Sequence, residues 1–262
     1  MKRHLQAWWL VLALIGTTAQ AGQTCRAEAP TVSEIERGMA MAQATAAKLD
    51  ASGADVLLLA RAGQNLDKYG LRWSHLGFAY RDTEGRWRVL HKLNDCGTDH
   101  SSIFRQGLGE FFMDKPWRYQ AAYEPLAPTL QKALLPLLRG EQGAALMTMD
   151  EPRYNMVAYA WGTRFQQSNQ WALETLAMVA GGPGDRAGAQ RWLQAQGYQP
   201  TVLHLSALER LGAETTRANV SFNDHPNGER FSGRIATVTA DSIFAWLPRA
   251  GLAGEMATVS SR

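Results

Sequence analysis

Two strand-like runs joined by a short polar turn constrain the fold of this chain more than any other sequence feature. Residues 73–80 and 87–93 are rich in aromatic and aliphatic side chains, and the segment between them includes Asp82 and Gly85. Aspartate and glycine favour the tight turn of a β-hairpin. The sequence therefore predicts two adjacent antiparallel strands here.

The rest of the chain alternates between helical and strand-like patterns. Helices are expected from apolar spacing and end signals at residues 32–49 (with Ser33 and Glu36 as a capping box), 126–138 (ending at Gly140), 168–180 (with Ser168 as N-cap), 185–196 (with Asp185 as N-cap) and 240–247. Strands are expected at residues 56–60, 155–161, 201–205 and 230–238, while 102–112 fits either element. We find no internal repeat and no linker long enough to separate domains. The sequence thus predicts one α+β domain over residues 22–262, an antiparallel sheet with packed helices.

The first 21 residues have the pattern of a secretory signal peptide. Lys2 and Arg3 provide a basic start, residues 7–15 are apolar, and the segment ends in Ala-Gln-Ala at Ala21. The apolar run is shorter than the roughly 20 residues that span a bilayer. We expect cleavage after Ala21, no stable membrane insertion, and a mature protein in the periplasm or outside the cell.

Composition excludes several classes of protein. Of the 262 residues, 45% are hydrophobic and 19% are charged, which excludes a disordered chain, a collagen-like fibre and a disulfide-dense miniprotein. The formal charge of +3 falls to +1 once Lys2 and Arg3 leave with the signal peptide. A near-neutral surface gives no electrostatic argument for nucleic acid. Because the chain has no phosphate-binding loop and no dinucleotide fingerprint, we expect no cofactor.

Cys25 and Cys96 are the two cysteines of the chain. In an oxidising compartment an even number favours a disulfide, and closing a loop of roughly 70 residues would stabilise the fold by about 4 kcal/mol. The alternative is that Cys96 is a nucleophile, because His75, His91 and His100 lie nearby in sequence. A cysteine held in a disulfide cannot take that role.

The densest group of potentially catalytic residues lies on the two strands of the predicted hairpin. If these strands pair, His75 and His91 come close on one face, although the register is open from sequence. Two neighbouring imidazoles can serve as a general base, bind a metal or simply satisfy backbone groups. Their spacing matches no compact zinc signature, so we expect no metal.

Five segments resemble a known family: RAGQNL at 61–66, LRWSHLGF at 71–78, WRVLHKLNDCGT at 87–98, QSNQWALE at 167–174 and NDHP at 223–226. Together they are similar to the bacterial family catalogued as domain of unknown function 2145. This resemblance covers essentially the whole mature chain. It implies no activity, since that family has none assigned.

The strand that bears His75 is more distantly similar to that of circularly permuted, NlpC-type papain-like hydrolases. This resemblance implies that His75 is the base, that His91 orients it, and that the helix beginning near Ser168 supplies the nucleophile. Those enzymes have a cysteine at the helix start, where the N-terminus favours a thiolate. Here Ser168 and Asn169 stand in its place, so Ser168 is either a substitute nucleophile or a helix cap.

Three functions remain open from sequence. The first is a binding protein on a degenerate papain-like scaffold, whose cleft near His75 takes a peptide or a cell-envelope component through Asn94, Asn169, Gln170 and Trp171. The second is an amide or ester hydrolase that uses His75 with Ser168. The third is a structural or assembly protein of the envelope. A further acid–histidine pair, Asp224 and His225, precedes a proline and is interpreted as a turn.

Overall fold

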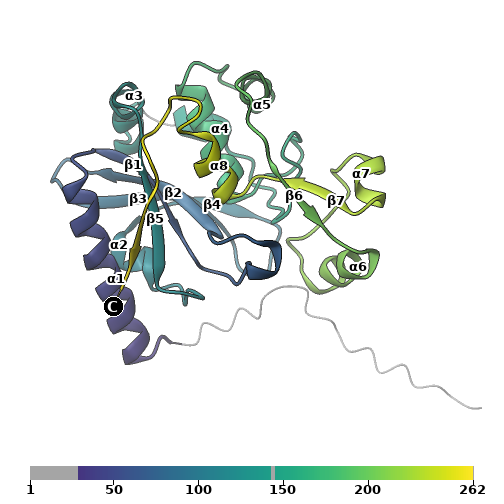
Figure 1. The fold of residues 1–262 in the computed structure, drawn as a ribbon, viewed down its shortest axis with the longest axis horizontal. Coiled ribbons are helices and arrows are strands. Elements are labelled where there is room, and N and C mark those ends of the chain that lie inside the picture. The colour runs from purple at the N-terminus through teal and green to yellow at the C-terminus, as the bar shows by residue number, and fades with distance from the viewer. Residues whose placement is uncertain (1–28, 143–144, 262) are drawn as a thin grey trace, which may run out of the picture.

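The computed structural model describes residues 29–142 and 145–261, and its centre is a six-stranded sheet (Figure 1). The strands are β1 (Val56–Arg61), β2 (His75–Arg81), β3 (Trp87–Asn94), β4 (Ser101–Gly107), β5 (Gln120–Pro125) and β8 (Ala257–Ser260). Their order is β4-β3-β2-β1-β5-β8, and every neighbouring pair is antiparallel. The predicted hairpin is confirmed as β2 and β3, with Phe78 opposite Leu90 and Arg81 opposite Trp87.

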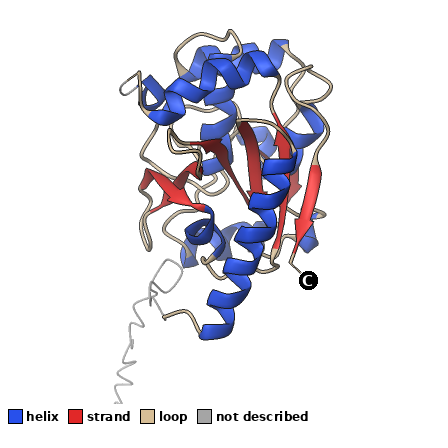
Figure 2. Ribbon diagram, turned by 90° about the vertical axis from the view of Figure 1, so that its left-hand side faces the viewer, coloured by secondary structure: helices blue, strands red, loops and turns tan. Residues whose placement is uncertain are grey.

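Helices cover both faces of this sheet (Figure 2). The longer elements are α1 (Val32–Ala51), α3 (Pro128–Arg139), α4 (Ser168–Val179), α5 (Arg186–Ala195) and α8 (Ala240–Trp246), with shorter turns at α2 (Leu108–Phe112), η1 (Asp67–Tyr69) and η2 (Ala145–Met149). A separate two-stranded sheet pairs β6 (Thr201–His204) with β7 (Arg234–Thr237), accompanied by α6 (Ala207–Thr216) and α7 (Asn227–Phe231). The mixed α+β architecture with an antiparallel sheet is as predicted.

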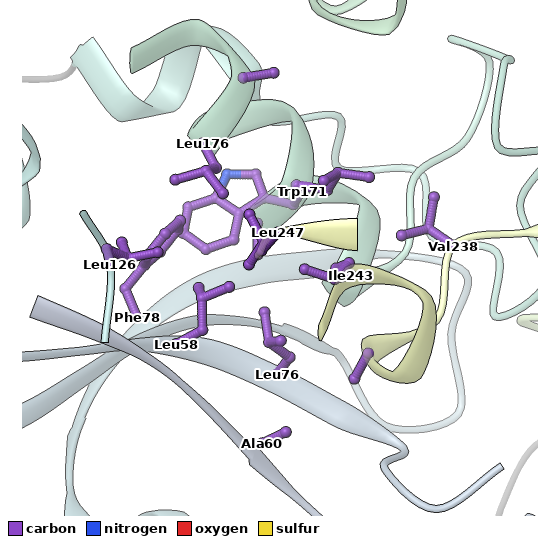
Figure 3. Close-up of a cluster of buried hydrophobic side chains, with 14 of the residues drawn as sticks. Leu58, Ala60, Leu76, Phe78, Leu126, Trp171, Leu176, Val238, Ile243 and Leu247 are labelled. Carbon is purple, nitrogen blue, oxygen red and sulfur yellow. The ribbon is translucent and has the colours of Figure 1, made fainter. Parts of the chain in front are cut away.

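Two hydrophobic clusters hold the layers together, one on each face of the sheet. The larger joins β1 and β2 to α3, α4 and α8, and in it the indole of Trp171 meets the ring of Phe78 edge to face at 5.8 Å (Figure 3). The smaller joins the opposite face to α1 and α2 through residues such as Leu57, Val89 and Phe111. The alternation of side chains along each strand supplies both clusters, because successive residues point to opposite faces.

Several predicted elements need correction. The capping box of α1 is formed by Thr31 and Glu34, not by Ser33 and Glu36, because Thr31 is the last residue with extended backbone. Residues 155–161 form no named strand and make only isolated bridges, such as Tyr159 with Thr237. The expected strand at 230–238 is divided between α7 and β7, and the ambiguous stretch 102–112 is a strand followed by a short helix.

Other end signals act as predicted. The helix α3 ends at Gly140, which adopts the left-handed conformation with φ of 81°, and Asp185 caps α5 by accepting the backbone N–H of Gly188. The expected signal peptide and its cleavage site lie outside the described residues. No helix in the described part of the chain is long and apolar enough to cross a membrane.

Candidate active site

The hydrogen-bonded chain Ser168–His75–His91–Gln106, which we call the relay, is the most distinctive polar feature of the fold. The Oγ atom of Ser168 lies 3.2 Å from Nδ1 of His75. The opposite ring nitrogen, Nε2, lies 2.7 Å from Nδ1 of His91, and Nε2 of His91 lies 2.9 Å from Oε1 of Gln106. The prediction that His75 and His91 share one face of neighbouring strands is therefore confirmed.

The amide oxygen of Gln106 sets the direction of every hydrogen bond in the relay. Since this oxygen can only accept, Nε2 of His91 donates to it and Nδ1 of His91 is left as an acceptor. His75 must then donate from Nε2, so its Nδ1 accepts the hydroxyl proton of Ser168. The arrangement places a neutral imidazole with a free lone pair against the serine hydroxyl.

Gly77 allows the two histidine-bearing strands to approach closely. A Cβ atom at Gly77 would lie 2.8 Å from Cβ of His91 and 3.0 Å from the carbonyl oxygen of Leu90. Gly77 lies two residues after His75, on the same face of β2, and the regular pairing of β2 with β3 begins only at Phe78. A larger residue would push β3 away from β2 at the level of the relay.

Burial and a nearby cation keep both histidines neutral. Desolvation lowers the pKa of His75 well below 6.5, and the positive charges of Arg61 and of a protonated His91 would lower it further. Burial and Arg61 lower the pKa of His91 to about 3, opposed by its hydrogen bond to Gln106. The ring of Phe111 packs against both imidazoles, with centroids 5.9 Å and 5.3 Å away.

Arg61 is itself a buried cation with well-defined partners. Its guanidinium donates to the carboxylate of Asp114 at 2.6 Å and to the backbone carbonyl of Phe111. In the register of β1 and β2 it lies directly opposite His75. The cation is thus held beside the relay by the sheet.

Ser168 is not the cap of α4. The N-cap is Gln167, whose side-chain oxygen accepts the backbone N–H of Asn169 at 2.7 Å, and Ser168 is the first helical residue. Its hydroxyl is therefore available to His75 rather than used to cap the helix. Burial raises the pKa of Tyr154, while hydrogen bonds to the hydroxyl and backbone N–H of Ser168 oppose that rise.

A cleft of about 860 Å³ opens beside the serine end of the relay. His75, Ser168 and Tyr154 line it, as do Asn94 and Asn169, two of the residues predicted to bind a ligand. It lies between one end of the six-stranded sheet and the small sheet of β6 and β7, whose residues form its far side. The relay therefore ends at a space large enough for a small-molecule or peptide ligand.

Two residues predicted to bind a ligand lie elsewhere. Trp171 is fully buried in the larger hydrophobic cluster, one helical turn beyond Ser168 (Figure 3). Gln170 is buried and donates to the carboxylate of Glu174 at 3.1 Å. These two side chains point from α4 into the protein, so neither of them lines the cleft.

A buried polar network anchors α4 behind the cleft. The carboxylate of Glu174 accepts from Arg186 at 2.6 Å and from Gln166 at 2.6 Å. Gln166 in turn accepts from the buried ammonium of Lys92, which also pairs with Asp150. These bonds join α4 to β3 and α5 and hold the start of the helix in place against the sheet.

Of the remaining candidates, Asp224 and His225 lie outside this site. Asp224 accepts the backbone N–H of Tyr159 at 2.9 Å and pairs with His225 at 3.1 Å, and neither Asp224 nor His225 lines the cleft. Cys96 lines the cleft, but Cys25 lies outside the described residues, so the disulfide stays a prediction. Within the described ranges, no group of three or more His, Cys, Asp or Glu could hold a metal ion.

Sequence reasoning missed three residues of the site: Gln106, Tyr154 and Arg61. Gln106 lies in the stretch that fitted either helix or strand, so its face could not be assigned. Had β4 been recognised, the alternation of its side chains would have identified Gln106 as facing the same side as His91, since His91 is opposite Phe104. Tyr154 and Arg61 carry no local signal of their roles.

The fold and site define a mixed α+β protein with a serine–histidine–histidine arrangement in the wall of a cleft. The family model described as "Uncharacterized protein conserved in bacteria (DUF2145)" matches residues 48–247, and the chain belongs to this family. Neither the search of curated proteins nor the search of solved structures found a match. The comparisons therefore give no support to the expected relation with papain-like hydrolases.

Proposed function

We propose that this protein is a serine-dependent hydrolase of amides or esters. The observation that carries the proposal is the relay, in which a serine hydroxyl in a cleft wall donates to a histidine that a second histidine orients. A nucleophile, a base and an orienting group within hydrogen-bond reach are the minimal requirement for acyl transfer. In this assignment Ser168 and His75 are catalytic, and His91 and Gln106 are positioning residues.

The chemistry follows from the direction of the hydrogen bonds. Oγ of Ser168 forms a bond to the substrate carbonyl carbon as its proton passes to Nδ1 of His75. The new imidazolium keeps its Nε2–H bonded to His91 and gives the Nδ1 proton to the leaving amine or alkoxide, whose bond to the carbonyl carbon breaks. Water then attacks the acyl-serine, loses a proton to His75 and releases the acid, and that proton returns to Ser168.

The start of α4 supplies stabilisation for the negative charge that develops on the carbonyl oxygen. A helix N-terminus carries partial positive charge, and Ser168 is the first residue of this twelve-residue helix. The hydroxyl oxygen of Tyr154 accepts from the backbone N–H of Ser168 at the same place, so this first amide of the helix is already paired. The stabilisation therefore comes from the helix dipole, which is in place before substrate arrives.

The same geometry favours this proposal over the two other functions left open by the sequence. A pure binding protein or an envelope assembly protein does not require a serine hydroxyl that leaves the helix cap to Gln167 and donates to a neutral imidazole. We also propose that the scaffold is a divergent form of the permuted NlpC-type hydrolase fold. The base, the orienting residue and the nucleophile on a helix follow one another along the chain in the order that this resemblance implies, with serine in place of cysteine.

The test is covalent labelling with a fluorophosphonate, which reacts with activated serines, followed by peptide mass spectrometry. We expect label on Ser168, loss of labelling in Ser168→Ala and His75→Ala, and unchanged labelling in Ser232→Ala, an exposed serine outside the cleft. Hydrolysis of a panel of p-nitrophenyl esters and p-nitroanilides should fall at least about 1,000-fold in the first two variants. Equal labelling of all variants, or label on another residue, would refute the proposal.

A further inference from the structure

A hollow of about 390 Å³ at the turn of the β2–β3 hairpin gathers four arginines, and we call it the arginine pocket. The arginines Arg86, Arg88, Arg105 and Arg139 line it together with Tyr80 and Asp82. This lining carries three net positive charges, and it shares no residue with the cleft beside Ser168. Along β2, Tyr80 in this pocket lies about 16 Å beyond His75 in the cleft.

The sheet and α3 bring these side chains together. Tyr80 lies opposite Arg88, and Arg105 lies opposite Leu90, so all of these residues face one side of the sheet. Tyr80 and Leu90 belong to the larger hydrophobic cluster, which is the one that α3 covers. Arg139 is the last residue of α3, a helix that lies on the side of the sheet away from β6 and β7 (Figure 1).

Arg105 has a guanidinium that pairs with no carboxylate in the described part of the chain. Its Nε donates to the hydroxyl of Tyr80 at 2.5 Å, and its Nη2 donates to the carbonyl of Leu138 at 2.7 Å. Burial raises the pKa of Tyr80, while the hydrogen bond from Arg105 and the charges of Arg105 and Arg88 oppose that rise. Neutral partners therefore fix the plane of this guanidinium, and its Nη1 stays open to a ligand.

The carboxylate in the lining is already shared between two arginines. Asp82 accepts from Nε of Arg86 at 2.9 Å and from Nε of Arg88 at 3.1 Å, which leaves the two terminal nitrogens of Arg88 without a partner among the described residues. Glu84 and Glu141 approach two of the arginines from outside the pocket. Both glutamates are exposed, so water and salt screen their charges.

Converging guanidinium groups are suited to binding an anion. Each presents a fork of N–H donors that matches the oxygens of a phosphate or carboxylate, and an anion between the groups relieves their mutual repulsion. The open donors come from Arg88 on β3 and Arg105 on β4, with Arg139 on α3 at a third side. A tetrahedral phosphoryl group directs oxygens toward several sides, whereas a carboxylate directs two oxygens within one plane.

We propose that the arginine pocket binds the phosphoryl group of a phosphate monoester, held by Arg88 and Arg105 with Arg139 beside it. This site lies apart from the relay and does not depend on the proposed hydrolase function. The phosphoryl group belongs either to a soluble monoester or to a lipid headgroup. Both present the same chemistry to the arginines, and the experiment distinguishes them.

Calorimetry with glycerol 3-phosphate tests the soluble form of the ligand. We expect saturable binding to the wild-type protein and a loss of at least about tenfold in affinity in Arg105→Gln and in Arg88→Gln, because each variant removes charged donors. Arg191→Gln is the matched control, since Arg191 is an exposed arginine on α5 outside the pocket, and its affinity should be unchanged. Malonate should bind more weakly than glycerol 3-phosphate.

Vesicle sedimentation tests the lipid form. Phosphatidylcholine vesicles containing phosphatidic acid are compared with vesicles given the same surface charge by phosphatidylglycerol, whose phosphate is a diester. Preference for phosphatidic acid that is lost in Arg105→Gln assigns the site to a lipid headgroup. Binding of glycerol 3-phosphate without that preference assigns it to a soluble monoester.

Arginine modification gives a readout that needs no variant to fold. Phenylglyoxal labels accessible guanidinium groups, and we expect glycerol 3-phosphate to protect Arg88 and Arg105 but not Arg191, as mapped by peptide mass spectrometry. Binding to neither glycerol 3-phosphate nor phosphatidic acid would overturn the proposal. Equal protection of Arg191, an equal loss of affinity in Arg191→Gln, or tighter binding of malonate would also overturn it.

Discussion

Replacing Glu124 with methionine should remove a strong pH dependence of folding stability. Glu124 is fully buried near the C-terminal end of β5, opposite Leu58 of β1, and neither of its carboxyl oxygens has a hydrogen-bond partner among the described residues. Its neighbours on the same face, Ala122 and Leu126, belong to the larger hydrophobic cluster. Burial raises the pKa of Glu124 from 4.5 to about 8, because the charged form loses its hydration.

The direction in which the free energy of unfolding changes with pH follows from proton binding. Between pH 4.5 and about pH 8 the folded protein holds the Glu124 proton and the unfolded chain has lost it. The free energy of unfolding therefore falls as pH rises, by about 1.4 kcal/mol per pH unit and about 5 kcal/mol over the window. At neutral pH about 3 kcal/mol of this has already been lost, which is a large share of the 5–15 kcal/mol typical of a domain.

The assay is urea unfolding of wild type and Glu124→Met, followed by circular dichroism at several pH values from 4.5 to 8.5. The histidines of the relay are common to both proteins, so their contribution cancels in the difference. The stability advantage of Glu124→Met should grow by about 5 kcal/mol across this range. Glu84→Met, which removes an exposed carboxylate from the β2–β3 turn, serves as control and should show no such trend. Parallel pH profiles for wild type and Glu124→Met would refute the reasoning.

Three further predictions concern the site. Gly77→Ala places a Cβ atom 2.8 Å from that of His91. Thermal unfolding should show that the free energy of unfolding falls by about 1–3 kcal/mol, and fluorophosphonate labelling of Ser168 should be lost. A variant that is equally stable and fully labelled would contradict the close approach. Arg61→Met removes the cation that lowers the pKa of His91, so the midpoint of its NMR titration should move to higher pH, and an unmoved midpoint would exclude that cause. Thiol titration of the denatured, unreduced protein should find no free thiol at Cys25 or Cys96. Cys96→Ser should lower the free energy of unfolding by about 2–5 kcal/mol. Two reactive thiols would reject the disulfide.

Much of the local structure could be predicted because its causes are local. Glycine at position 140 adopts the left-handed conformation that ends α3, and Asp185 caps α5 through a contact three residues away. The shared face of His75 and His91 could likewise be predicted from the sequence. A short turn predicts the hairpin, and the two-residue period of strands predicts which side chains share a face. In each case the interacting groups lie within one turn or one hairpin of each other.

The sequence by itself therefore determined the α+β class, most of the secondary structure and one histidine pair. Only the tertiary structure decided that Gln167 rather than Ser168 caps α4, that Trp171 faces the core, and that Ser168 meets His75 across 93 residues of chain. A serine at a helix start has the same local chemistry whether it caps the helix or attacks a carbonyl. Which role it takes depends on the partner that packing brings to its hydroxyl, and that partner is set by the register of distant strands and the docking of α4 against them.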